Sequence, residues 1–437
     1  MARKKILFGV GAGIVSLGID GISSLLILRL LTQYLSVDKA GYWILVTSAG
    51  SLLLVLQCGL GPAIARAVAT ARVANDTDKL RSLLGAVDVA FRFVAGAVAV
   101  AAVAIFFCYL WSTAQRAHLT LASAMGWFPY AVGMAANLQG QASIFILNGY
   151  GEVGWDKVFR SVFTVLGFVA VWGALMMGAS LPTLGLIYLG QNLLFWIAAH
   201  WKLRGYLDES ARRLPPQAGQ VGTLFREGSK LLLLSVLTYL ITQFTIFIVE
   251  KYFGLTQVAA YSAMLRVGVL IGTVGSLLPQ MLYPYTASSW AAGDYARCRR
   301  YYVAGLLISV AITLLMVLPL CLFGREIFAL WLGAKVPYSA ACFAAVLVFY
   351  VVYVHHSAHA TPALAVEGDA FTIPAIINTA MVMILVFELP RFLGLVGVPL
   401  GMVLGTAPVS AYVVWKSWRM IMMPSPIVAP ADFGTQL

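Results

Sequence analysis

The chain has 437 residues, of which 61% are hydrophobic and 11% charged, and its formal net charge is +12 at pH 7. Soluble domains carry about 25% charged residues, so this composition excludes an ordinary soluble enzyme, a disordered chain and a disulfide scaffold. In a membrane protein the distribution of Lys and Arg between the two sides of the membrane is more informative than the net charge, because it indicates the orientation of the chain.

The apolar runs predict an all-α integral membrane protein with about 12 transmembrane helices, since each crossing takes about 20–25 residues. In chain order the predicted spans are 6–33, 40–65, 84–112, 119–148, 158–178, 182–201, 229–250, 256–287, 301–323, 338–364, 370–390 and 395–421. The polar stretch 208–222 separates six spans from six. We therefore predict an N-terminal lobe (1–207), a cytoplasmic linker (208–228), a C-terminal lobe (229–421) and a cytoplasmic tail (422–437).

The Lys and Arg residues sort by side of the membrane. With both ends on the same side, 20 of the 29 fall on connectors and ends at that side, and 6 fall on the opposite connectors. Cytoplasmic connectors carry an excess of Lys and Arg, so the bias predicts that the N- and C-termini are cytoplasmic. The charge then marks one face of a membrane protein, and we expect no nucleic-acid partner.

The two predicted lobes resemble each other in sequence. Tyr34-Leu35 corresponds to Tyr252-Phe253, and the run 40–42 (AGY) corresponds to 259–261 (AAY), about 218 residues later. Pro62 near the end of span 2 has counterparts near the end of span 8. Chance similarity between apolar helices is the alternative explanation. A duplicated unit of six helices is typical of secondary transporters, whose substrate sites lie between the repeats.

Charged residues inside predicted spans need a reason, because each costs roughly 2.5–3.5 kcal/mol on insertion scales. Asp20 and Arg29 lie on span 1, Arg66 ends span 2, and Arg266 is midway along span 8. Three guanidinium groups facing one cavity would suit a phosphate, to which each can donate two hydrogen bonds. The alternatives are pairing with Asp20, snorkelling towards head groups and, for Arg66, an ordinary inner-face charge. Asp20 is also a candidate for coupling to a proton or sodium ion.

Span 10 carries three of the five histidines of the chain, His355, His356 and His359. His355 and His359 share a helix face and are candidate coupling groups through protonation. We predict no metal site, since no carboxylate or Cys accompanies them, and polar lining of a wet cavity is the plainest interpretation. The chain has no phosphate-binding loop, HExxH or GxSxG motif, so we expect neither an enzyme nor a cofactor.

Several stretches carry a family resemblance. They are LLTQYLSVDKAGYW, LQCGLGPAIARAVA, FILNGYGEVGWDKVFRSV, AAYSAMLRVGVLIGTVGSLLPQMLYPYTA and FGREIFALWLGAKVPYSA. Through them the chain resembles the Wzx-type polysaccharide flippases of the MOP superfamily, relatives of the lipid II flippase MurJ and of the MATE multidrug exporters. The chain departs from this pattern at Gln57, where many relatives have an acidic residue.

The resemblance implies two six-helix lobes in a V with alternating access. It implies transport of an undecaprenyl-diphosphate-linked oligosaccharide, an O-antigen or exopolysaccharide unit, to the outer leaflet of a bacterial inner membrane. Arg29, Arg66 and Arg266 occupy places similar to those of the diphosphate-binding arginines of related flippases. The expected partners are this substrate, membrane lipids, and polysaccharide polymerase and chain-length proteins.

Aromatic side chains of the cavity could stack on the sugar, and the candidates are Tyr42, Tyr261 and Tyr283, with Trp43 and Tyr285 beside them. Packing within the lobes or in the membrane interface is an equally good explanation for these aromatics.

Two other functions stay open. A MATE-type drug antiporter is favoured by Asp20, and a polyprenyl-phosphate transferase would need clustered carboxylates, for which Asp76, Asp78 and Asp88 are the nearest candidates.

Overall fold

The structure, a computed structural model, describes residues 2–55, 57, 59–207, 214–333, 335–367 and 370–423. These residues form helices and contain no β-strand, which confirms the predicted all-α fold. The part of the predicted linker at 208–213 and the predicted tail from 424 onward lie outside the described residues. The chain divides into two compact units, Met1–Tyr239 (unit 1) and Leu240–Leu437 (unit 2).

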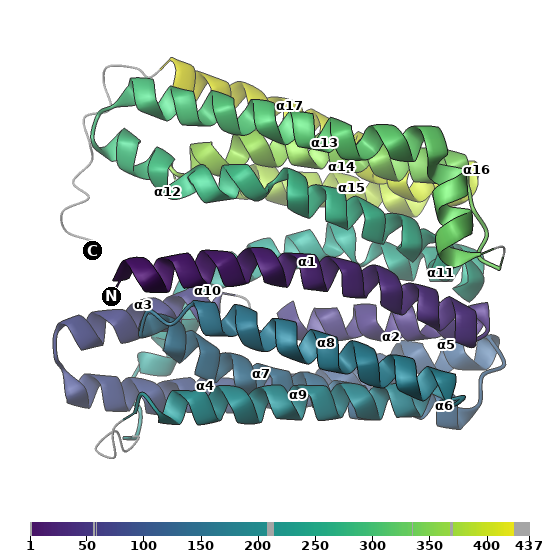
Figure 1. The fold of residues 1–437 in the computed structure, drawn as a ribbon, viewed down its shortest axis with the longest axis horizontal. Helices are drawn as coiled ribbons and strands as arrows, with labels where there is room; N and C mark the ends of the chain where they lie inside the picture. Colours follow the sequence, from purple (N-terminus) through teal and green to yellow (C-terminus); the bar gives the residue numbers. More distant parts are fainter. Residues whose placement is uncertain are drawn as a thin grey trace. The chain divides into compact units, whose positions relative to one another are not determined.

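The described residues of the first half of the chain form a series of helices (Figure 1). They are α1 (Ala2–Tyr34), α2 (Val37–Val55), α3 (Leu60–Val73), α4 (Thr77–Ile105), the π-helical turn η1 (Phe106–Leu110), α5 (Trp111–Arg116), α6 (Leu121–Met125), α7 (Trp127–Gly149), α8 (Gly154–Met176) and α9 (Leu181–Arg204). Within unit 1, α7 packs most extensively on α9, and α1 packs on α8. The core contains large buried side chains such as Phe91 and Trp127, whose indole N–H donates to the Ala102 carbonyl.

The second half contains α10 (Gln220–Thr242), α11 (Thr245–Gly275), α12 (Leu277–Ala291), α13 (Tyr295–Leu332), α14 (Ala340–Leu364), α15 (Thr372–Glu388), α16 (Pro390–Leu393), the 3₁₀ turn η2 (Gly394–Val396) and α17 (Gly397–Met422). In unit 2, α17 packs on α14 and α15, and α12 packs on α13. The helix labelled α11 is interrupted at Gly254, where φ is 77° and ψ is 179°. That interruption lies within the connector predicted between spans 7 and 8.

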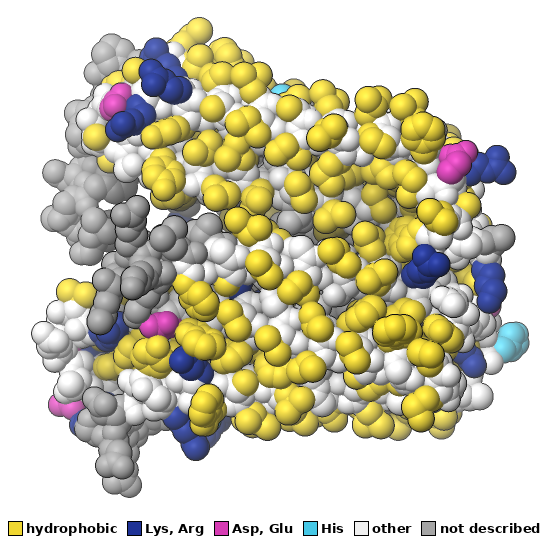
Figure 2. Space-filling view, viewed as in Figure 1, with side chains coloured by type: hydrophobic (Ala, Val, Ile, Leu, Met, Phe, Trp, Pro, Cys, Tyr) yellow, Lys and Arg dark blue, Asp and Glu magenta, His cyan; other side chains and the backbone are white. Residues whose placement is uncertain are grey.

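Among the described residues, nine stretches are long and apolar enough to cross a membrane. Two of them, of 72 and 51 residues, exceed the roughly 20 residues that one crossing needs and therefore hold more than one span. Figure 2 shows apolar side chains over the middle of the helices on the visible face, with Lys and Arg mostly near the helix ends. A band of exposed apolar side chains is the surface that a helix presents to lipid, and the protein is a multi-pass membrane protein.

The two halves share a turn with the same register. After α3, Asn75 adopts a left-handed conformation (φ 51°) and the Asp76 carboxylate accepts a hydrogen bond of 2.9 Å from the Lys79 N–H. After α12, Gly293 has φ 74° and the Asp294 carboxylate accepts one of 3.0 Å from the Arg297 N–H. Each position is 218 residues after its counterpart, the spacing that the sequence comparison indicates. The matched turns and caps support the predicted duplication.

The beginning of α10 is tied to unit 1. The Leu214 N–H donates to the Arg81 carbonyl (3.3 Å), and the Gln220 side chain donates to the Ser82 hydroxyl (3.0 Å). Farther along, α10 crosses the break between α2 and α3 with Gly228 directly against Gly59, where the backbones approach so closely that a Cβ on either glycine would meet the other. The predicted linker, 208–228, is therefore helical from Gln220 onward and packed against its own unit.

Candidate functional site

The carboxylate of Asp20 lies half-buried where α1 packs on α8. It accepts hydrogen bonds from the Thr164 hydroxyl at 3.0 Å and from the Ser16 hydroxyl at 3.4 Å. Ser16 is one turn earlier on α1, so the helical repeat itself places this donor beside the carboxylate. The structure describes no ion pair between Asp20 and Arg29, which lie about 14 Å apart along the helix axis. Pairing with Asp20 therefore does not account for Arg29.

Arg29 and Arg66 are both exposed, and neither has an acidic partner among the described residues. Their depths differ. Counted from the turn at Ser36 with a rise of 1.5 Å per residue, Arg29 lies about 10 Å along α1 and Arg66 about 45 Å along α2 and α3. The apolar core of a bilayer is about 30 Å thick, so these two arginines belong to opposite ends of unit 1.

Arg266 lies half-buried on α11, 12 residues beyond the interruption at Gly254 and therefore about 18 Å along the helix. Three glycines, Gly268, Gly272 and Gly275, form one face of the same helix and lie against side chains of α13 and α14, among them Tyr350. Arg266 precedes Gly268 by two residues and so points roughly 200° away from it around the helix axis. The helix thus uses its glycine face for packing and carries Arg266 on the opposite face.

The three candidate arginines are divided between the units: two belong to unit 1 and Arg266 belongs to unit 2. The shared three-arginine anion site stays a prediction. Within unit 1, the two arginines are not brought together.

The histidines of α14 form a polar cluster in unit 2, in which His359 is buried and His355 and His356 are half-buried. The Tyr302 hydroxyl on α13 is hydrogen-bonded to His359 Nδ1, and the ring of His355 packs edge-on against that of His359 at a centroid distance of 4.6 Å. His359 Nε2 and His356 Nδ1 are buried without a hydrogen-bond partner among the described residues. No group of three or more metal-binding side chains is arranged to hold a metal in the described part of the chain.

Two of the candidate sugar-contacting aromatics are interior residues. Tyr42 and Tyr261 are fully buried, and their hydroxyls donate to the Leu110 carbonyl and to the Met402 sulfur, both at 3.4 Å. Packing within their own units accounts for both residues, and neither presents surface to a sugar in this conformation. Tyr283 and Tyr285 on α12 are exposed and stay candidates.

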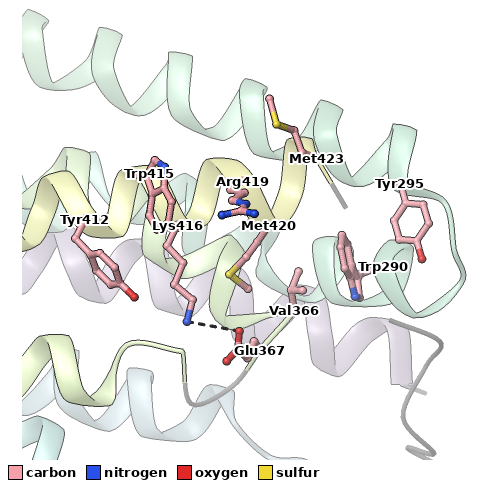
Figure 3. A pocket seen from close by; sticks show the side chains of 10 residues that line it. All are labelled: Trp290, Tyr295, Val366, Glu367, Tyr412, Trp415, Lys416, Arg419, Met420 and Met423. Carbon is pink, nitrogen blue, oxygen red and sulfur yellow. Dashed lines mark ion pairs between the residues drawn. The ribbon is translucent and has the colours of Figure 1, made fainter. Parts of the chain in front are cut away.

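Sequence reasoning did not find a pocket in unit 2 that has a volume of about 660 Å³ (Figure 3). Its lining residues are Trp290, Tyr295, Val366, Glu367, Tyr412, Trp415, Lys416, Arg419, Met420 and Met423. Lys416 Nζ lies 3.7 Å from Glu367 Oε2 and donates to the Ala370 carbonyl at 3.3 Å. Positions 412, 415, 416, 419 and 423 repeat with the helical period, so this face of the last span was visible in the sequence.

Comparison with protein-family profiles gave no match, and no curated protein sequence matches the chain. Solved structures do match. A multidrug resistance MATE family transporter of the MOP superfamily, in an inward-facing conformation, is 17% identical with a TM-score of 0.72, over 94% of this chain and 98% of that chain. The lipid II flippase MurJ, in an inward closed conformation, is 15% identical with a TM-score of 0.73, over 95% of this chain and 90% of that one.

A third similar structure is a MOP superfamily transporter from Pyrococcus furiosus. It is 16% identical with a TM-score of 0.62, over 96% of both chains, and its binding pocket is described as having reverse polarity, which suggests a different function for it. At such identities the likeness defines the fold. The chain is a multi-pass membrane protein with the fold of the MOP superfamily transporters.

Proposed function

We propose that the protein transports an undecaprenyl-diphosphate-linked oligosaccharide from the cytoplasmic to the outer leaflet of a bacterial inner membrane by alternating access. The observation that carries the proposal is the arrangement on α1. Asp20 is held by two hydroxyls, and Arg29 has no acidic partner among the described residues. A membrane helix that keeps an unpaired arginine retains it at a cost, and binding of an anionic group is a reason for that cost.

The depths of the arginines suggest an order of contacts with the diphosphate. Under the predicted orientation Arg66 lies near the cytoplasmic end and Arg29 near the outer end of unit 1. In the proposal, Arg66 contacts the diphosphate early and Arg29 contacts it late, with Arg266 acting in unit 2. Each guanidinium can donate two parallel hydrogen bonds to a phosphate group.

The membrane potential can assist this movement. Moving one elementary charge through 100 mV is worth about 2.3 kcal/mol, so a diphosphate of charge about −2 gains roughly 4–5 kcal/mol on leaving a negative interior. Flipping in vesicles should slow when an ionophore collapses the potential. Unchanged rates would exclude the potential as a driving force.

The direct test compares arginine variants in vesicles that contain a fluorescent undecaprenyl diphosphate–sugar. Hydrogen bonds to charged groups are worth about 1.5–3 kcal/mol, so Arg29→Gln and Arg266→Gln should each lower the flipping rate about tenfold or more. Arg391→Gln is the matched control, because Arg391 is exposed, lies in α16 and pairs with Glu388 at 2.9 Å. Wild-type rates for Arg29→Gln and Arg266→Gln would remove both residues from the diphosphate path.

The second candidate function is a cation-coupled drug exporter, and the surroundings of Asp20 favour it. A half-buried carboxylate whose hydrogen-bond donors among the described residues are hydroxyls is a group that a proton or sodium ion can bind. Such an exporter would expel a cationic dye such as ethidium in cells, and Asp20→Asn would abolish that efflux. Absence of dye efflux together with flipping of the lipid probe would exclude this alternative.

A further inference from the structure

The pocket of unit 2 lies where two connections of that unit meet the end of α17. Trp290 closes α12 and Tyr295 opens α13, Val366 and Glu367 follow α14, and the remaining side chains come from the last three turns of α17 (Figure 3). Tyr252, which donates a hydrogen bond to the Phe387 carbonyl, marks the opposite end of this helix bundle. The pocket is therefore at a helix end, the level at which a bilayer changes from acyl chains to head groups.

The pocket has two cationic side chains, Lys416 and Arg419, which differ in their partners. The charge of Lys416 is directed to Glu367 and to the Ala370 carbonyl. Arg419 has no acidic partner among the described residues, and its guanidinium carbon lies 5.7 Å from the centre of the Trp415 ring. Stacking on an indole restricts the guanidinium and leaves its N–H groups free to donate. The site thus presents a planar donor that is suited to a phosphate.

The rest of the lining is largely apolar and partly exposed. Trp415 is 56% exposed and Met423 is 68% exposed, and Tyr412 and Met420 lie on the same helix face. Exposed Trp and Tyr at the end of a membrane helix are typical of the interface with head groups. A ligand that satisfies both halves of the pocket has an anionic phosphate and a hydrocarbon chain. A soluble phosphate compound would leave the apolar half uncovered.

We propose that this pocket binds the phosphate head group of an anionic glycerophospholipid, with Arg419 donating to the phosphate and the acyl chains lying against Trp415 and Met423. Under the predicted orientation this lipid belongs to the cytoplasmic leaflet. Because the pocket joins α12, α13, α17 and the connection after α14, the bound lipid holds one end of unit 2 together. The proposal does not depend on what the protein transports.

The test uses the purified full-length chain in detergent. Thermal unfolding is followed during titration with phosphatidylglycerol, phosphatidylcholine or inorganic phosphate. We expect phosphatidylglycerol to raise the unfolding temperature in a saturable way and the other two to have little effect. Arg419→Gln should weaken the apparent affinity for phosphatidylglycerol about tenfold, and Arg391→Gln, at the other end of unit 2, should leave it unchanged.

Several results would overturn the proposal. Phosphatidylcholine also has a phosphate but is neutral overall, so equal stabilisation by both lipids would overturn the preference for an anionic head group. Stabilisation by inorganic phosphate alone would make the ligand a free ion. A second comparison uses a chain that ends at Met423. If Arg419→Gln weakens the affinity for phosphatidylglycerol in the full-length chain but not in this shortened chain, the partner of Arg419 is within residues 424–437 and the lipid proposal is overturned. Should Arg419→Gln not fold, Arg419→Lys keeps the charge and loses the planar fork, and wild-type affinity in that variant would also count against the proposal.

Discussion

The contact between Gly59 and Gly228 gives a prediction whose magnitude follows from the structure. Gly59 has φ 95°, and a Cβ there would overlap the carbonyl group of Gly228. A left-handed conformation costs a residue with a Cβ about 1–2 kcal/mol, and overpacking costs about 1–3 kcal/mol. Gly59→Ala should therefore destabilise unit 1 by about 2–5 kcal/mol.

Alanine substitutions at three other glycines measure the cost of the left-handed conformation and the cost of overpacking separately. Gly219 has φ 83° with open space around it, so Gly219→Ala should cost only about 1–2 kcal/mol. A Cβ on Gly228 would lie 2.9 Å from the Gly59 carbonyl carbon, and Gly228 has no positive φ, so Gly228→Ala should cost about 1–3 kcal/mol. Gly222 has neither constraint and lies inside α10, so Gly222→Ala should be neutral or stabilise by up to about 1 kcal/mol.

The assay is unfolding of the four purified variants in one detergent, with the folded fraction followed by tryptophan fluorescence. The reasoning requires Gly59→Ala to be the least stable and Gly222→Ala the most stable. If Gly59→Ala and Gly219→Ala are equally stable, the backbone of α10 does not press on the α2–α3 break, and the contact that ties α10 to unit 1 is refuted.

Two further predictions concern the caps and the carboxylate on α1. Asp76→Ala and Asp294→Ala remove equivalent helix caps and should each cost about 0.5–2 kcal/mol, measured by the same unfolding assay; a cost in only one unit would contradict their equivalence. Thr164→Val removes the shorter of the two hydrogen bonds to the Asp20 carboxylate while keeping the side-chain shape, so it should destabilise unit 1 by about 1–3 kcal/mol in the same unfolding assay. An unchanged stability would show that Thr164 does not hold Asp20.

The fold was largely predictable because membrane helices follow from local composition. The span predicted over 158–178 corresponds to α8 (Gly154–Met176), and that over 395–421 corresponds to α17. The helix break at Gly59 was not predicted, whereas the interruption at Gly254 lies in the connector predicted between spans 7 and 8. Gly59 occurs within an apolar run where hydropathy does not change, and the break depends on a positive φ angle that glycine alone adopts easily.

The candidate site was less predictable, because a charge in a span does not reveal its partner. Pairing of Arg29 with Asp20 was one alternative that the sequence left open, and the structure instead gives Asp20 a partner 144 residues away, Thr164. Tyr42 and Tyr261 belong to motifs that read as functional, yet both are buried by their own units. The pocket beside Arg419 combines residues from α12, α13, α17 and the connection after α14, a grouping that only tertiary packing creates.

Comparing the two repeated units distinguishes residues that support the fold from residues that could serve a function. The turn before α4 and the turn before α13 share a left-handed conformation at the same position, Asn75 in one and Gly293 in the other, and both are followed by an aspartate cap. At the same spacing of 218 residues, however, Arg66 corresponds to Pro284, and Arg266 corresponds to Ser48. Shared turns and caps preserve the helices, which both units need. An arginine that has no arginine at the equivalent position of the other unit is not needed to form the helices, because the other unit forms the same helices without it. Arg66 and Arg266 are therefore candidates for a function that is specific to one unit.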